Sequence, residues 1–68
     1  MENLLHRKIK GFKFEYYRKQ GYNSKMNKHI GKIGKITELD KDDVKVQFED
    51  GNRWYYPIYL IQEHLIQG

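Results

Sequence analysis

The sequence has 68 residues, with no cysteine, 38% hydrophobic residues and a formal net charge of +4. This length suits one compact domain but not two, and the lack of cysteine excludes both a disulfide framework and a thiolate metal cage. Residues 1–37 carry ten basic and two acidic side chains, whereas residues 38–68 carry three basic and seven acidic ones. A basic half of this kind either attracts anionic partners or keeps a small domain in solution.

Membrane and secretion signals are missing from the sequence. No stretch approaches the ~20 apolar residues that a membrane-spanning helix needs. The first residues, Met1–His6, lack the basic and then apolar order of a secretory signal. We therefore expect a cytoplasmic protein that does not enter a membrane.

The first predicted strand covers residues 8–15, where charged residues alternate with apolar or aromatic ones. Gly11 lies within it, and glycine inside a strand often marks a bend. Residues 18–29 follow as a polar stretch with only Tyr22 and Met26 as apolar anchors. Because two anchors are too few for an amphipathic helix, we predict a long first loop, and loops of this length are often functional.

The second predicted strand covers residues 30–39 and ends at the turn-forming Asp40–Asp43. The third and fourth, residues 43–49 and 52–57, have the alternating pattern of a β-hairpin. The register of this hairpin decides which aromatic side chains are exposed, so it needs a physical argument of its own.

Two registers are compatible with the hairpin sequence. A two-residue turn would leave Trp54 on the exposed face. A three-residue loop, with Gly51 in the left-handed conformation, instead pairs Val46 with Trp54 and Val44 with Tyr56 on one face. We predict this second register, because a small core would otherwise lose its largest side chain.

Pro57 ends the fourth strand, since proline cannot donate to a β ladder. Residues 58–60 are short enough for a single tight 3-10 turn, and residues 61–66 are predicted to supply a last strand. The pattern of about five short strands, too few for two sheets, predicts an all-β fold, a small curled barrel that protects its edges by near closure.

Several motifs occur in this order along the chain: the glycine motif Gly31–Ile36, the hairpin motif Val44–Gly51, Trp54 and the turn Pro57–Leu60. Together with Met26, and over roughly residues 24–65, they resemble the SH3-like repeat of the Mind bomb type. The resemblance implies that residues 1–68 form one SH3-like barrel with a long first loop. A short 3-10 turn then precedes the last strand of this barrel. It also implies a non-catalytic module that recognises a protein or peptide, although SH3-like barrels host many unrelated activities.

Two further resemblances keep other functions open. The Gly31, Gly34 and Ile36 pattern, with Val44 and Val46 downstream, is similar to the KOW element of ribosomal and transcription-elongation proteins, which implies contact with RNA or the ribosome. The chain also resembles small proteins of unassigned role encoded by bacteria and their phages. A phage-borne inhibitor that binds one host protein is therefore a third hypothesis.

The sequence contains no arrangement typical of catalysis or of metal binding. The three histidines lack the spacing of metal ligands, and Ser24, the only serine, lies in no nucleophile motif. The acidic stretch Asp40–Asp43 lacks the glycine and the distal glutamate of a calcium loop. We expect no enzymatic activity, no metal and no cofactor.

For a protein or peptide partner, an SH3-like barrel offers a groove between its long loop and the hairpin, and tyrosines suit such a groove because a buried ring keeps a polar tip. In the predicted register Tyr55 points outward beside Arg53, with no structural reason for its exposure. The candidate partner-binding residues are Tyr17, Tyr22, Arg53, Tyr55 and Tyr59.

For RNA or DNA, the informative pattern is basic residues interleaved with aromatic ones, because cations neutralise phosphate and rings stack on bases. Residues 8–19 have this pattern, but Phe12 and Phe14 would equally serve as core. The alternative nucleic-acid-binding residues are Lys8, Lys10, Lys13, Arg18, Lys19, Lys25, Lys28, Lys32 and Lys35. The sequence leaves the partner's identity and the oligomeric state open.

Overall fold

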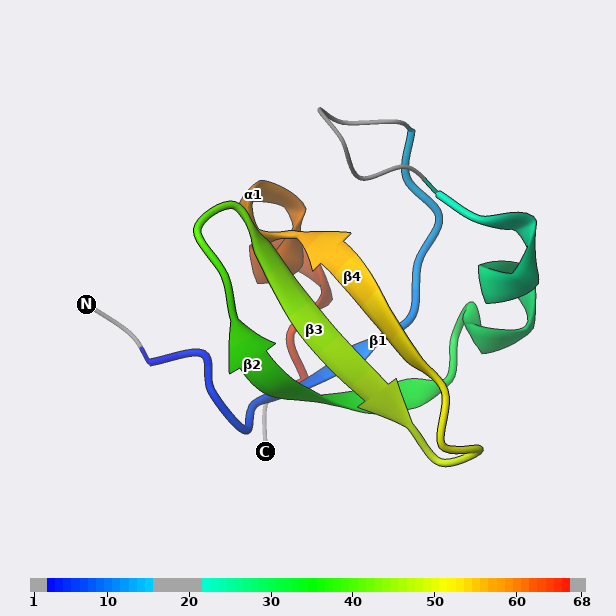
Figure 1. Cartoon of the computed structure of the whole chain (residues 1–68), viewed down its shortest axis with the longest axis horizontal. Coiled ribbons are helices and arrows are strands. Elements are labelled where there is room, and N and C mark those ends of the chain that lie inside the picture. Colours follow the sequence, from blue (N-terminus) through cyan, green and yellow to red (C-terminus); the bar gives the residue numbers. More distant parts are fainter. Residues whose placement is uncertain (1–2, 16–21, 67–68) are drawn as a thin grey trace.

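The computed structural model describes residues 3–15 and 22–66, and within them four antiparallel strands form one sheet in the order β1-β2-β3-β4 (Figure 1). The strands are β1 Lys8–Lys10, β2 Ile33–Leu39, β3 Asp43–Phe48 and β4 Arg53–Pro57. The helical segments are the 3-10 helix η1 Ser24–His29, the short α-helix α1 Ile58–Ile61 and the 3-10 helix η2 Gln62–His64. The fold is a small SH3-like all-β domain, as the sequence predicts, although its sheet does not close.

The β3–β4 hairpin adopts the predicted three-residue register. Val46 pairs with Trp54 and Val44 pairs with Tyr56 across the two strands. Gly51 has a φ of 87°, in the left-handed region that favours glycine. The hairpin therefore buries its apolar side chains on one face, and Trp54 packs half-buried against the core.

The strand pairing separates an inner and an outer face of the sheet. The inner face packs on the core, whose buried residues are Leu4, Ile9, Phe12, Phe14, Met26, Ile36, Val44, Val46, Phe48, Tyr56 and Ile61. Side chains alternate across a strand, so the neighbouring positions point the other way. The outer face carries Lys8, Lys10, Ile33, Lys35, Thr37, Glu38, Lys45, Gln47, Arg53 and Tyr55.

The predicted first strand over residues 8–15 is too long, because pairing in β1 stops at Lys10. Gly11 forms an isolated parallel bridge with Ile30, and a Cβ atom at Gly11 would collide with the backbone carbonyl of His29. The chain then leaves the sheet, and Phe12 and Phe14 pack into the core. The second strand, predicted over residues 30–39, likewise begins later, at Ile33.

The long loop predicted over residues 18–29 contains a helix, η1. The Asn23 side chain caps it by accepting a hydrogen bond from the Lys25 backbone N–H at 2.8 Å. Met26 and His29 are its two buried residues. In a 3-10 helix side chains three positions apart lie on the same side, so these two form its apolar face. In the sequence only Tyr22 and Met26 stand out as apolar anchors, because His29 is polar by composition, so no helix was predicted there.

The last strand predicted over residues 61–66 is wrong, because α1 and η2 occupy most of this segment. Leu65 forms only an isolated bridge with Ile9 on β1. Ile58, Ile61 and Leu65 all pack on the core, and this spacing of three and four residues is helical. Without a fifth strand the sheet stays open.

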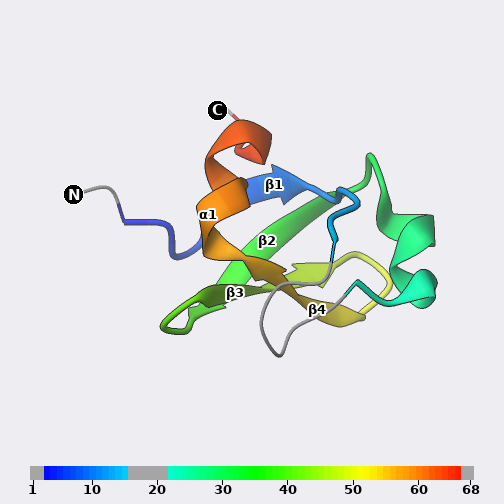
Figure 2. The same cartoon turned by 90° about the horizontal axis from the view of Figure 1, so that it is seen from above.

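Figure 1 and Figure 2 show η1 and α1 at opposite ends of the sheet. In both views the N-terminal segment lies at the end that carries α1, whereas the β3–β4 turn lies nearer to η1. Within residues 3–15 and 22–66, no helix is long and apolar enough to cross a membrane.

Candidate partner-binding surface

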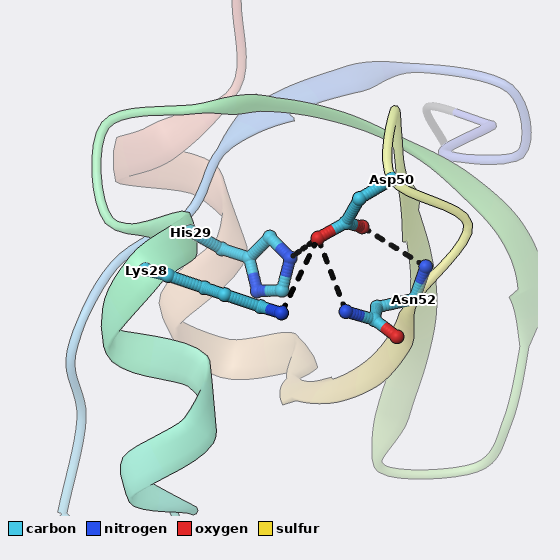
Figure 3. Close-up of polar contacts among 4 residues, drawn as sticks. All are labelled: Lys28, His29, Asp50 and Asn52. Atoms are coloured by element: carbon cyan, nitrogen blue, oxygen red, sulfur yellow. Dashed lines mark hydrogen bonds and ion pairs between the residues drawn. The ribbon is translucent and has the colours of Figure 1, made fainter.

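A polar junction joins the end of η1 to the β3–β4 turn (Figure 3). His29 Nε2 lies 2.8 Å from Asp50 Oδ2, and Lys28 Nζ lies 3.7 Å from the same oxygen. The Asn52 backbone N–H donates to Asp50 Oδ1 at 3.0 Å, and the Asn52 side-chain amide donates to Asp50 Oδ2 at 3.1 Å. One carboxylate thus fixes the end of the long loop against the hairpin.

His29 is the buried member of this junction, with 3% of its surface exposed. Its ring stacks on Phe48, with the ring centroids 4.3 Å apart and the planes inclined by 24°. An imidazole with its proton on Nε2 donates to the carboxylate of Asp50 and keeps its apolar face against the phenyl ring. The contact therefore combines a hydrogen bond with ring packing.

The junction also holds Asp50 in its ionised form. The backbone N–H of Asn52, and then the hydrogen bond from His29, lower the pKa of Asp50 from 3.8 to about 2. Hydrogen bonds to a carboxylate stabilise its charged form, which explains the direction of this change. This pair could not be predicted from the sequence, because His29 and Asp50 are 21 positions apart and only folding brings them together.

Two grooves adjoin on this side of the molecule. The first, here called the loop groove, has a volume of about 470 Å³ and lies between η1 and the β3–β4 turn, where Lys28, His29, Lys32, Ile33 and Glu49 line it. It occupies the position predicted from the sequence for a groove between the long loop and the hairpin. Its lining combines two lysines, two carboxylates and the apolar Ile33 and Phe48, and none of the tyrosines in the described part of the chain contributes to it.

The second, here called the sheet groove, lies over the outer face and has a volume of about 500 Å³. Lys8, Lys35, Thr37 and Gln47 line it, and it shares Ile33, Phe48 and Glu49 with the loop groove. Ile33 stands where the two grooves meet, with 50% of its surface exposed. The two grooves therefore adjoin, with the apolar Ile33 at their shared boundary.

The structure brings two of the predicted partner-binding residues together. Arg53 and Tyr55 lie on the outer face of β4, and Tyr55, 36% exposed, has the Lys45 ammonium 5.4 Å from its ring centre. Tyr59 is 57% exposed but belongs to α1, at the other end of the sheet. Tyr22 is not part of this pair, and the binding role of all five residues stays a prediction.

Tyr22 is half-buried, because its ring packs edge-on against Phe14 at 5.3 Å between centroids. Its hydroxyl donates to Asn27 Oδ1 at 2.7 Å, which connects the residue two positions before η1 to the helix itself. Tyr17 lies outside the described residues. The contacts of Tyr22 give it a structural role in the loop.

The predicted nucleic-acid-binding residues are distributed over several elements. Lys8, Lys10 and Lys35 lie on the outer face, whereas Lys25 and Lys28 belong to η1. The others in the described part are Lys13, which follows β1, and Lys32, which lines the loop groove. Arg18 and Lys19 lie outside the described residues.

The two described aromatic residues of the predicted nucleic-acid pattern are in the core. Phe12 and Phe14 are buried and pack on each other with ring centroids 5.8 Å apart. A buried ring cannot stack on a base, so residues 8–15 retain only their lysines for contact with phosphate. Nucleic-acid binding itself stays a prediction.

The described residues also bear on metal binding. Across residues 3–15 and 22–66, no three His, Cys, Asp or Glu side chains gather as the ligands of a metal ion would. In the acidic turn between β2 and β3, the Asp40 carboxylate instead accepts a hydrogen bond from the Lys41 backbone N–H at 2.8 Å.

Comparisons with known proteins identify the family. No curated protein matches the chain, and no solved structure matches it. The family model described as the Mind bomb SH3 repeat domain matches residues 6–57, a span that contains all four strands, η1 and both grooves. This match covers more than half of the sequence, so the chain belongs to the Mind bomb SH3 repeat domain family.

Proposed function

We propose that this domain is a non-catalytic module that binds a segment of another protein in the depression formed by the loop groove and the sheet groove. The observation that carries the proposal is the pair of adjoining grooves with half-exposed Ile33 at their boundary. An apolar anchor surrounded by polar groups is the usual composition of a peptide-binding site. Membership of an SH3-like family supports an interaction role.

Arg53 and Tyr55 extend this site along β4. Gln47 lines the sheet groove and pairs directly with Arg53. A bound segment that lies in the sheet groove and continues across β3 therefore reaches β4. There it contacts Arg53, with Tyr55 beside it on the same strand. Arginine and tyrosine are enriched among the residues that carry binding energy at protein interfaces.

The polar junction gives the site its fixed walls. His29 and Asp50 line the loop groove from opposite sides, one from η1 and the other from the β3–β4 turn. Their hydrogen bond holds these two elements at a fixed separation before a partner arrives. Preorganised walls reduce the conformational entropy lost on binding.

A displayed library of random peptides tests the proposal, with the ¹⁵N-labelled domain used to map the selected binders by NMR. We expect chemical-shift changes at Ile33, Lys35, Gln47 and Arg53. The Ile33→Ser variant should weaken the selected peptides by about tenfold, the loss expected for one apolar anchor.

Leu39→Ser is the matched control, because Leu39 is also on β2, is 47% exposed and lines neither groove. It should bind the selected peptides as the unmodified domain does. Equal losses for Ile33→Ser and Leu39→Ser, or shifts confined to α1 around Tyr59, would contradict the proposed site.

A further inference from the structure

A row of four paired residues, here called the cation row because three of them are positively charged, crosses the outer face of the sheet from one edge strand to the other. Lys8 on β1 pairs with Lys35 on β2, Lys35 pairs with Gln47 on β3, and Gln47 pairs with Arg53 on β4. Three of the four members of this cation row carry positive charge, and three of the four line the sheet groove. Lys10 adds a further charge on β1, opposite Ile33.

The pairing of Lys8 with Lys35 is unfavourable for the isolated domain. The Gly11 N–H donates to Lys32 O at 2.8 Å, and the Ile36 N–H donates to Arg7 O at 2.9 Å. In the alternation of an antiparallel ladder, Lys8 and Lys35 then form a non-hydrogen-bonded pair, the type in which side chains lie closest. Like charges directly opposite each other destabilise a sheet, so an anion between them is the arrangement that relieves the repulsion.

Nearby carboxylates leave most of this charge unneutralised. The Glu38 carboxylate lies 3.3 Å from Lys45 Nζ, so Lys45 is already ion-paired. Neither Lys8, Lys35 nor Arg53 has an ion pair with any described residue. Glu49 is the acidic residue that lines the sheet groove, at the end it shares with the loop groove.

The other groups on the outer face match a peptide better than a nucleic acid. Tyr55 is its only aromatic residue among those the structure describes, and it is already in contact with Lys45. Single-stranded nucleic acid is usually held by several aromatic rings that stack on bases. Ile33, Thr37 and Gln47 instead offer an apolar contact and hydrogen-bonding groups for a main chain.

From this geometry we infer that the protein segment bound here is an acidic extended peptide whose carboxylates contact Lys8, Lys35 and Arg53 while an apolar side chain covers Ile33. The inference rests on the proposed function and specifies its partner. Adjacent strands are about 4.8 Å apart, so the row spans roughly 15 Å, and one side of an extended chain presents a side chain every ~6.7 Å. Three acidic residues at alternate positions therefore span ~13 Å, close to the length of the row and within reach of its long side chains.

Fluorescence anisotropy with defined probes tests the inference. The first probe is a labelled peptide in which glutamate alternates with serine around a central leucine, and the second has glutamine in place of every glutamate. Short single-stranded and duplex DNA are the third and fourth. We expect the glutamate peptide to bind at least about tenfold more tightly than the glutamine peptide or either DNA.

Matched charge variants locate the contact. Lys35→Gln combined with Arg53→Gln should weaken the glutamate peptide by about tenfold, because two charge-assisted contacts are lost. Lys25→Gln combined with Lys41→Gln removes the same net charge from exposed lysines outside the row and should leave binding within about twofold. Equal losses in the two double variants would overturn the inference, since binding would then follow net charge alone.

The inference and the proposed function fail in different ways. If library-selected peptides bind at Ile33 but carry no excess of acidic residues, the inference is overturned and the proposed function stands. If DNA binds through the cation row and no peptide does, both are overturned in favour of the nucleic-acid hypothesis. If neither peptides nor DNA bind, the proposed function fails and the inference fails with it.

Discussion

The two faces of the sheet are built from the same strands but meet opposite requirements. On the inner face Ile36, Val44 and Val46 are fully buried and close a small core. On the outer face Lys8 and Lys35 are placed opposite each other, and Ile33 stays half-exposed between two grooves. The inner face explains why the domain folds, whereas the outer face has features that folding alone does not require.

The largest expected difference between the faces is in stability, and two isoleucines of β2 measure it. Ile36→Ala removes a side chain with no exposed surface and should lower the free energy of unfolding by about 2–5 kcal/mol. Ile33→Ala, three positions earlier, should change it by no more than about 0.5 kcal/mol. Urea denaturation of the two variants checks this, and similar losses would contradict the assignment of the faces.

The hairpin register that separates the faces depends on Gly51. Its φ of 87° places it in the left-handed region, so Gly51→Ala should cost about 1–2 kcal/mol of unfolding free energy. Gly51→Asn should cost less, because asparagine adopts this conformation more readily than alanine. Thermal unfolding of the two variants measures this difference. An alanine variant as stable as the unmodified domain would mean that the turn has a different conformation.

The junction between η1 and the hairpin should make the loop groove sensitive to acid. The folded-state pKa of Asp50 is lowered from 3.8 to about 2, so its stabilising contribution is complete above pH 3.8 and is lost as the pH falls to about 2. Asp50→Asn should be less stable than the unmodified domain at neutral pH, and the difference should shrink across this window. Unfolding midpoints measured as a function of pH test this, and a constant difference would argue against the ionised pair.

The smallest expected effect is a gain in stability on the outer face. Lys35→Gln removes the repulsion with Lys8 and should raise the free energy of unfolding by about 0.2–1 kcal/mol. The same variant should bind the glutamate peptide more weakly. Higher stability with weaker binding would show that this pair serves recognition, whereas a loss of stability would contradict that view.

Much of the inner face could be predicted from the sequence, because one alternating pattern and one physical argument were enough. Val44 and Val46 define the face, and the need to bury Trp54 selects the register that the structure shows. The C-terminal segment could not be predicted in the same way. Ile61 and Leu65 fit a strand and a helix equally well over so few residues, and packing on the core decides for the helix.

The candidate site was less accessible to sequence analysis. The outward position of Tyr55 and Arg53 follows from the hairpin register alone, so both could be predicted. The contact between His29 and Asp50 and the alignment of Lys8 with Lys35 could not, because each joins residues far apart in the sequence. Such pairs become visible only when the strand order and the path of the long loop are known.

The most direct test of the central claim, that the outer face binds an acidic partner segment, is an NMR titration of the ¹⁵N-labelled domain with the alternating glutamate peptide. The account predicts that the shifted backbone signals cluster at Lys8, Ile33, Lys35, Gln47 and Arg53, across all four strands. Shifts that cluster instead around Tyr59 on α1, or no saturable shifts on the outer face, would contradict it.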